Sequence, residues 1–222
     1  MISPRQADYF HINNPKMKIV KLSVGAISIL SLMFLCSCAT VGTNFKSSSL
    51  DTLEFGKMTP PQAIKLFGKP YSTYSKTATN GNFLTYKYYY AATRPGAAFE
   101  RVLLLEFKEE QLNAYIWWSS FEMDKTKFDV DAVNKIKGGV GKLTKDDVVT
   151  IMGAPQGKAL CPSIVGNFKD LCEKNTELWD WYMRDSINLW TKKDVKSSEL
   201  IVSFGLDGKV SSVELTQASQ PN

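Results

Sequence analysis

The chemistry open to this chain is set by its one histidine and its four cysteines. His11 is the only histidine, and it lies upstream of an apolar run that ends near Cys36 and Cys38. Ser-His or Cys-His nucleophilic catalysis and histidine metal sites need an imidazole in the folded body. If the segment up to residue 37 is removed, none remains. We therefore expect no enzymatic activity, no catalytic or metal site, and no cofactor.

Three carboxylates are the remaining candidates for catalysis. Glu106, Asp180 and Glu199 all lie on expected strands. A pair of carboxylates is enough for a glycoside hydrolase that acts on cell-wall sugar. No motif marks these residues, and a charged residue on a strand usually lies on the solvated face. A carboxylate-based cell-wall hydrolase is therefore our third hypothesis.

The first 37 residues have the pattern of a secretory signal peptide. Lys18 and Lys21 precede an apolar run over 22–35, which is shorter than the ~20 residues of a membrane-spanning helix. Met17 is an alternative start, which would make residues 1–16 an extension outside the protein. We expect the segment to be removed during export.

The end of this segment resembles the lipobox of bacterial lipoproteins. It reads Leu35-Cys36-Ser37-Cys38-Ala39, with Cys38 in the position that is acylated. Two or more acyl chains anchor a protein stably, and residues 38–49 are polar enough to form a tether. The residue that follows Cys38 is Ala39 rather than Asp, and in this position the chain is similar to lipoproteins sent to the outer membrane. We expect a lipid-anchored protein that faces the periplasm.

The other two cysteines and the charge balance limit the possible partners. Cys161 and Cys172 are an even pair in an oxidising compartment, which predicts one disulfide. Residues 1–37 hold four basic residues and one acidic residue, so they account for +3 of the formal net charge of +5. Nucleic-acid binding needs a concentrated basic face. We expect neither a nucleic acid nor a small-molecule substrate as partner.

A segment of the sequence occurs twice, over 56–70 and 141–155. The two copies align without a gap, and their Gly, Lys, Thr, Gly and Pro are identical. Thr59 and Thr144 are placed as helix N-caps, with a capping-box partner three residues later. A glycine and a proline then end each copy. Each copy predicts a short helix with both ends specified.

Strand patterns follow each helix, and another short helix is expected before it. The sequence predicts an α+β fold of two tandem repeats over 50–124 and 125–222. In each, two helices precede a three- to four-stranded antiparallel sheet. The expected strands cover 83–90, 101–107, 112–119, 178–184, 199–204 and 209–215, and the expected leading helices cover 49–54 and 129–137.

The order G-x-x-T, short helix, G-x-P, aromatic strand and F-x-x-x-G-x-V/L hairpin occurs twice. It resembles the SmpA/OmlA (BamE-like) lipoprotein domain, and also the two-repeat fold of the secreted β-lactamase inhibitor protein. The first resemblance implies a subunit of the complex that inserts β-barrel proteins into the outer membrane, although that family has a single domain. The second implies an inhibitor whose concave sheet face holds an enzyme, with a disulfide where Cys161 and Cys172 lie.

The strands carry more aromatic side chains than one helix-covered face can hold. An antiparallel sheet with helices on one face leaves the other to solvent or a partner, and exposed aromatics with polar neighbours are typical of protein-binding surfaces. Alternatively, these side chains cover each other between the repeats. The expected partner-binding residues are Tyr89, Tyr182, Trp190 and one of the pair Trp117 and Trp118, because adjacent strand residues point to opposite faces.

The leading hypothesis is a non-enzymatic lipoprotein that serves as an interaction or scaffold subunit. Its assembly would be an outer-membrane or trans-envelope complex, such as the barrel-assembly machinery or a secretion apparatus. The second hypothesis is an inhibitor of a periplasmic or extracellular enzyme such as a β-lactamase.

Overall fold

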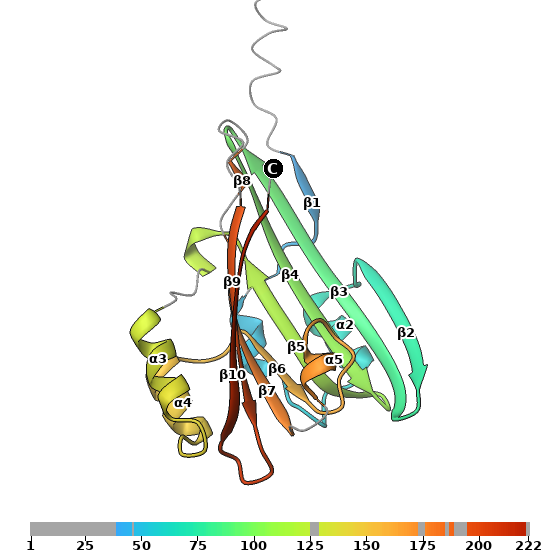
Figure 1. Ribbon diagram of the computed structural model, residues 1–222. Coiled ribbons are helices and arrows are strands. Elements are labelled where there is room, and N and C mark those ends of the chain that lie inside the picture. The colour runs from blue at the N-terminus through green and yellow to red at the C-terminus, as the bar shows by residue number, and fades with distance from the viewer. Residues whose placement is uncertain are drawn as a thin grey trace, which may run out of the picture. The chain divides into compact units, whose positions relative to one another are not determined.

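The computed structural model (Figure 1) shows short helices packed on an antiparallel sheet. The expected signal peptide over 1–37, the acylation candidate Cys38 and the partner-binding candidate Trp190 lie outside the described residues. Residues 38–222 belong to one compact unit. The structure describes residues 39–45, 47–124, 129–172, 176–184, 187–188 and 195–220.

In the described part of the chain, ten strands form one sheet, and its strand pairs are antiparallel. The order across the sheet is β1-β3-β4-β5-β6-β7-β9-β10, while β2 also pairs with β3 and β8 with β4. The strands are β1 (Thr40–Gly42), β2 (Ser72–Ala78), β3 (Gly81–Arg94), β4 (Ala97–Lys108), β5 (Gln111–Ser119), β6 (Gly157–Leu160), β7 (Glu177–Arg184), β8 (Ile187–Asn188), β9 (Val195–Phe204) and β10 (Val210–Gln220).

The helices are short and lie between these strands along the chain. Among the described residues, two are 3-10 helices and four are α-helices. Their bounds are η1 (Ser47–Thr52), α2 (Pro60–Phe67), η2 (Glu122–Asp124), α3 (Val130–Gly138), α4 (Lys145–Met152) and α5 (Phe168–Leu171). The mixed α+β class expected from the sequence is therefore observed.

The two copies of the repeated segment form α2 and α4, each with the expected ends. The Thr59 N–H donates to the Gln62 side chain, and the Thr144 N–H donates to the Asp147 side chain, both at 2.8 Å. Gly68 and Gly153 close the helices at φ values of 83° and 80°, with ψ near 180°. That region of backbone space is nearly restricted to glycine, which explains why glycine stands at both ends.

The sheets expected after the two copied segments are joined into one continuous sheet. β5 and β6 join the halves, because Ala114 pairs with Ala159 and Ile116 with Gly157. A strand at the edge of a sheet has unpaired N–H and C=O groups, and β6 satisfies those of β5. The sequence gives little sign of β6, which is short and directly follows Pro155 and Gln156.

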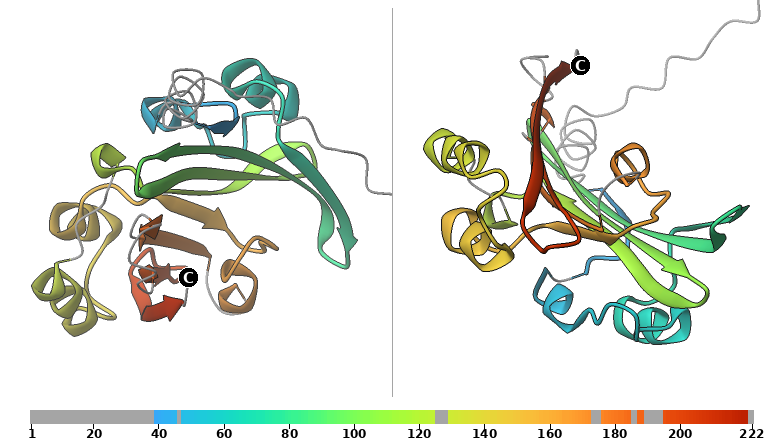
Figure 2. Two further views of the ribbon diagram at one scale, coloured as in Figure 1. Left: turned by 90° about the horizontal axis from the view of Figure 1, so that it is seen from above. Right: turned by 60° about the horizontal axis from the view of Figure 1, so that its bottom comes forward.

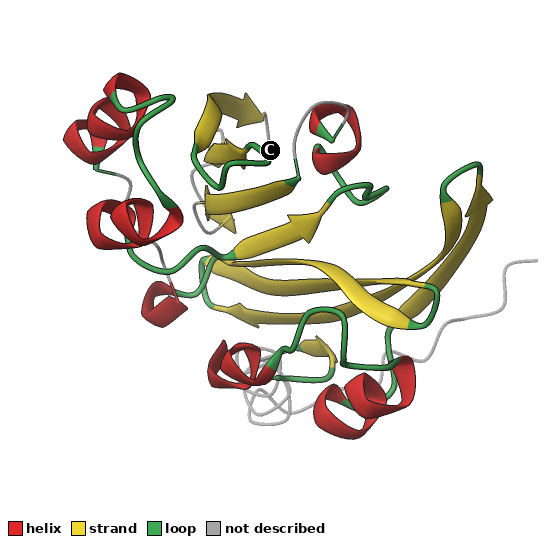
Figure 3. Ribbon diagram, turned by 90° about the horizontal axis from the view of Figure 1, so that it is seen from below, coloured by secondary structure: helices red, strands yellow, loops and turns green. Residues whose placement is uncertain are grey.

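The helices of both halves cover the same face of this sheet, which we call the outer face. α2 and η1 pack on β3–β5 around Phe67, Tyr88 and Leu103. α3 and α4 pack on β7, β9 and β10 around Ile136 and Trp181. Figure 2 shows α2 on one side of the green strands, and Figure 3 shows the strands curving away from it.

The opposite face, which we call the inner face, carries a smaller third core. Phe168 of α5 packs there against Ala114, Ala159 and Leu178, beside Cys161 and Cys172. The expected disulfide between these cysteines is present, with the two Cα atoms 5.1 Å apart. The loop that it closes therefore covers only the middle of the inner face and leaves the rest open.

The residues expected to form a polar tether are instead part of the fold. Thr40–Gly42 pairs with β3, and Phe45 is only 6% exposed. The Phe45 ring lies 5.3 Å from that of Trp117, centroid to centroid. The tether prediction was wrong because it was drawn from polar composition alone. Composition shows neither that Phe45 is buried nor that β1 pairs through its backbone groups. None of the helices among the described residues is long and apolar enough to span a membrane.

Candidate functional site

Three of the predicted partner-binding residues lie together on the inner face. Tyr89 of β3 and Trp118 of β5 both pair with Val102 of β4, so the three side chains share one face. Tyr182 of β7 joins them, with its ring centroid 5.7 Å from that of Trp118. All three aromatic side chains are half-buried. They lie on a face that the main helices leave open, and their role in binding stays a prediction.

Two charged residues bind this aromatic group together. The Arg184 guanidinium carbon lies 5.3 Å from the centre of the Trp118 ring, which is cation–π range. Arg184 Nη1 also lies 2.9 Å from Glu100 Oε1. The Tyr89 hydroxyl donates a hydrogen bond to Glu100, and burial together with the Glu100 charge raises the pKa of Tyr89. Register across three strands creates this cluster, so sequence reasoning could not find Glu100 or Arg184.

Tyr71 extends the cluster to the sheet edge and was also missed. Its side chain is 61% exposed, and its ring centroid lies 5.5 Å from that of Tyr89. Tyr71 follows the helix-ending Gly68-Lys69-Pro70 and precedes β2, so no strand periodicity assigned it a face. We call the resulting set the inner-face strip, which consists of Tyr71, Tyr89, Glu100, Trp118, Tyr182 and Arg184.

The strip has both a structural role and an open surface. Trp118 with Tyr182, and Glu100 with Arg184, join the first half of the chain to the second. To that extent the alternative expectation, that the aromatics cover each other between the repeats, also holds. Tyr71 and the free sides of the other rings remain accessible. Large, preorganised rings with charged neighbours are the composition of protein-binding hot spots.

Trp117 must be removed from the predicted set of partner-binding residues. It pairs with Leu103 on the outer face and is only 3% exposed. Adjacent residues of a strand point to opposite faces, so only one of Trp117 and Trp118 can lie on the inner face. Packing of Phe45 and η1 on the outer face decides that it is Trp118.

Glu106 is buried and holds the disulfide loop on the inner face. Its carboxylate accepts from Asn113 Nδ2 at 2.9 Å and from the Ile164 N–H at 2.8 Å. Asn113 Nδ2 also contacts the carbonyl oxygens of Leu160 and Pro162. Burial raises the pKa of Glu106, although these hydrogen bonds oppose the shift. The residue is therefore built into the structure, contrary to the solvated position that we expected.

Asp180 is also buried, but neither of its carboxylate oxygens has a hydrogen-bond partner among the described residues. Burial, and secondarily the charge of Glu199, raises the pKa of Asp180 well above 3.8. Burial also raises the pKa of Glu199, which accepts from Asn167 Nδ2 at 2.7 Å. A glycoside hydrolase needs its carboxylates in a cleft that a sugar can enter. Glu106 and Asp180 are enclosed, so these residues do not form such a site.

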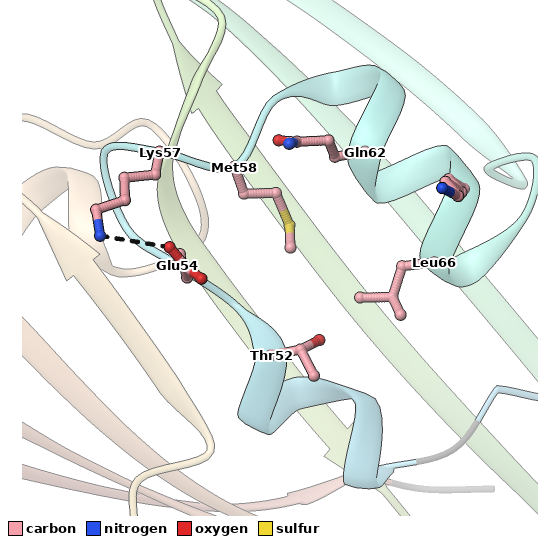
Figure 4. Close-up of a pocket in the computed structure, with 7 residues that line it drawn as sticks. Thr52, Glu54, Lys57, Met58, Gln62 and Leu66 are labelled. Atoms are coloured by element: carbon pink, nitrogen blue, oxygen red, sulfur yellow. Dashed lines mark ion pairs between the residues drawn. The ribbon is translucent and has the colours of Figure 1, made fainter.

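A groove of about 400 Å³ opens on the outer side between η1 and α2 (Figure 4). Met58 and Leu66 point into it, and the Glu54–Lys57 ion pair lies at its margin with 3.5 Å between charged atoms. Both charged side chains are mostly exposed. The described residues contain no group of three or more His, Cys, Asp and Glu side chains that could hold a metal ion. The groove combines two apolar side chains with polar and charged ones, which are Thr52, Glu54, Lys57, Gln62 and Lys65.

Comparisons with known proteins leave the family open. No protein-family model matches the chain, and no curated protein matches its sequence. One solved structure with a similar backbone is titled a "putative beta-lactamase inhibitor protein" from Streptococcus mutans. It is 14% identical, and the match covers 78% of this chain and 98% of that chain with a TM-score of 0.42. A TM-score of this size does not establish a common fold, and the SmpA/OmlA resemblance stays a prediction.

Proposed function

We propose that this protein is a lipid-anchored envelope protein that binds another protein through the inner-face strip and catalyses no reaction. The strip carries the proposal, because it holds accessible aromatic rings in fixed positions on a sheet face that the main helices leave uncovered. The lipobox at Cys38 supports attachment to a membrane, with Ala39 favouring the periplasmic side of the outer membrane. The protein would act as an interaction or scaffold subunit of an envelope assembly.

We also propose that the body is a duplication of one α+β unit. β2–β3–β4–β5 follow α2 and are neighbours in the sheet, and β6–β7–β9–β10 follow α4 in the same way. The identical residues of the two copied segments support a common origin. An experimental structure in which the two sets of strands fail to superpose would contradict the duplication.

Crosslinking in intact cells tests the binding role. Tagged full-length protein would be compared with a Tyr71→Ser/Tyr89→Ser double variant. Tyr74→Ser is the matched control, because Tyr74 lies on β2 with a similar exposure of 58%. The proposal predicts a discrete crosslinked partner in the wild type and the control, and its loss in the double variant. The same crosslinks from all three proteins would contradict it, provided that their melting temperatures agree.

Inhibition of an enzyme is the second candidate function. The disulfide-closed loop with α5 lies on the same face as the strip, which gives that face a rigid projection beside open aromatics. Titration of the purified protein against β-lactamases and envelope hydrolases separates this function from scaffolding. Stoichiometric loss of activity for one enzyme would favour inhibition, and unchanged activities would leave the scaffold role.

A further inference from the structure

The residue that follows the acylation candidate is fixed to the sheet. The Ala39 N–H donates to Thr93 Oγ1 at 3.1 Å, and the Thr93 N–H donates to the Ala39 carbonyl at 2.9 Å. Thr40–Gly42 then pairs with Tyr90–Ala92 of β3. Consecutive Cα atoms are 3.8 Å apart, so the acyl chains of Cys38 would begin directly beside this end of β3.

Two further features fix the position of residues 39–45 on the sheet. Gly42 has a φ of 81°, and a Cβ atom there would lie 2.0 Å from the Tyr89 carbonyl oxygen. Phe45 inserts its ring between those of Phe67, Tyr88 and Trp117 on the outer face. No flexible linker therefore separates the expected anchor from the folded body.

The same end of the sheet carries a strand turn, β8 and the last described residues of the chain (Figure 1). The β3–β4 turn lies there, β8 pairs with the first residues of β4, and Val195 pairs with Gln220. Exposed Arg94 and Lys196 give this end positive charge. Exposed Glu109 and Glu110 lie at the opposite end of β4, which spans about 40 Å at ~3.3 Å per residue.

We propose that the end of the sheet bearing Ala39 and the β3–β4 turn rests on the membrane surface. The long strands then stand away from the bilayer, and Arg94 and Lys196 face anionic lipid headgroups. This inference rests on acylation of Cys38, which is part of the proposed function. Tyr89 is five residues from Arg94, so this ring of the strip lies about 17 Å from the surface. The partner of the strip is then a protein held at the same membrane.

Fluorescence quenching in vesicles tests this orientation. The acylated protein, with its disulfide intact, would carry a fluorophore at Pro95→Cys or, as the matched control, at Leu206→Cys in the distant β9–β10 turn. Leu206 is 97% exposed, so both sites accept a label. The vesicles would contain phosphatidylethanolamine and phosphatidylglycerol with a quencher on the headgroup. We expect strong quenching at position 95 and none at position 206.

A linker variant and a mass measurement separate the possible failures. About ten Gly and Ser residues inserted between Cys38 and Ala39 have a root-mean-square span of about 18 Å. This insertion should remove most of the difference in quenching between positions 95 and 206. Equal quenching at both positions in a protein of confirmed acylated mass would overturn the orientation alone. An unacylated Cys38 would overturn the proposed anchor and this inference together.

Discussion

Two buried carboxylates on the inner face should respond in opposite ways to the same substitution. Glu106→Gln replaces a carboxylate that accepts from Asn113 Nδ2 and from the Ile164 N–H. The amide can keep only one of these bonds, because its NH2 group faces a donor at the other position. Asn113 cannot turn over to compensate, since its Nδ2 also contacts the Leu160 and Pro162 carbonyls. Glu106→Gln should therefore destabilise the fold.

The magnitude follows from the bonds that are lost. A hydrogen bond to a charged group contributes about 1.5–3 kcal/mol, and a buried donor without a partner costs about 1–3 kcal/mol. Removing the buried charge of Glu106 offsets part of this loss in the free energy of unfolding. We expect the free energy of unfolding to fall by about 2–4 kcal/mol at pH 7 for Glu106→Gln. Urea unfolding followed by tryptophan fluorescence measures it, provided that the m-value is unchanged.

Asp180→Asn is the matched control, because neither oxygen of Asp180 has a hydrogen-bond partner among the described residues. The pKa of Asp180 is raised on folding, so protonation favours the folded state. The Asp180 side chain therefore stabilises the folded state fully at pH values below the pKa that its carboxyl has in the unfolded chain. This stabilisation is lost as the pH rises through the pKa of the carboxyl in the folded state. Each pH unit in that window costs at most about 1.4 kcal/mol. Asp180→Asn removes this loss, so its advantage over the wild type should grow as pH rises above 3.8.

The two results together can refute the reasoning. A change of less than about 0.5 kcal/mol for Glu106→Gln would show that its hydrogen bonds do not hold the disulfide loop, since this is the scatter of ordinary surface substitutions. Equal destabilisation by both variants at pH 8 would show that burial of Asp180 does not disfavour its charge.

Three further substitutions test the packing. Replacing Cys161 and Cys172 by Ser opens a loop with a sequence separation of 11 and should cost about 3 kcal/mol in urea unfolding, whereas an unchanged midpoint would argue against the bond. Phe45→Ala should cost about 3–5 kcal/mol by the same assay, and a cost below 1 kcal/mol would mean that the segment after Ala39 is not docked. Thr144→Ala should lower the free energy of unfolding in the same assay by about 1 kcal/mol, because the Thr144 side chain accepts from the Asp147 N–H; an unchanged stability would contradict the cap assignment.

Local signals made the helices and the central strands predictable. Capping residues and the terminal glycines specify α2 and α4 without any tertiary contact. Apolar and aromatic runs likewise marked β3, β4, β5, β7 and β9. β2 was missed because most of its residues are exposed, so the sequence Ser72–Ala78 shows no apolar alternation. β1 was missed because its pairing uses backbone groups of a polar stretch.

The candidate site was only partly predictable, for a reason of geometry. Periodicity places Trp117 and Trp118 on opposite faces but does not say which face the helices cover. Contacts between Glu100 and Arg184 depend on the register of strands far apart in sequence. Asp180 is buried without a hydrogen-bond partner among the residues that the structure describes. This contradicts the usual behaviour of strand carboxylates, so only the structure could reveal it.

Site-specific photo-crosslinking in intact cells tests the central claim most directly. A photoreactive residue would replace Tyr89 in the full-length protein, with Leu206 as the matched position in the exposed β9–β10 turn. The proposed function predicts one discrete protein adduct from position 89, in the membrane fraction, and none from position 206. Identical adducts from both positions, or none from either in a protein recovered from the membrane, would contradict binding through the inner-face strip.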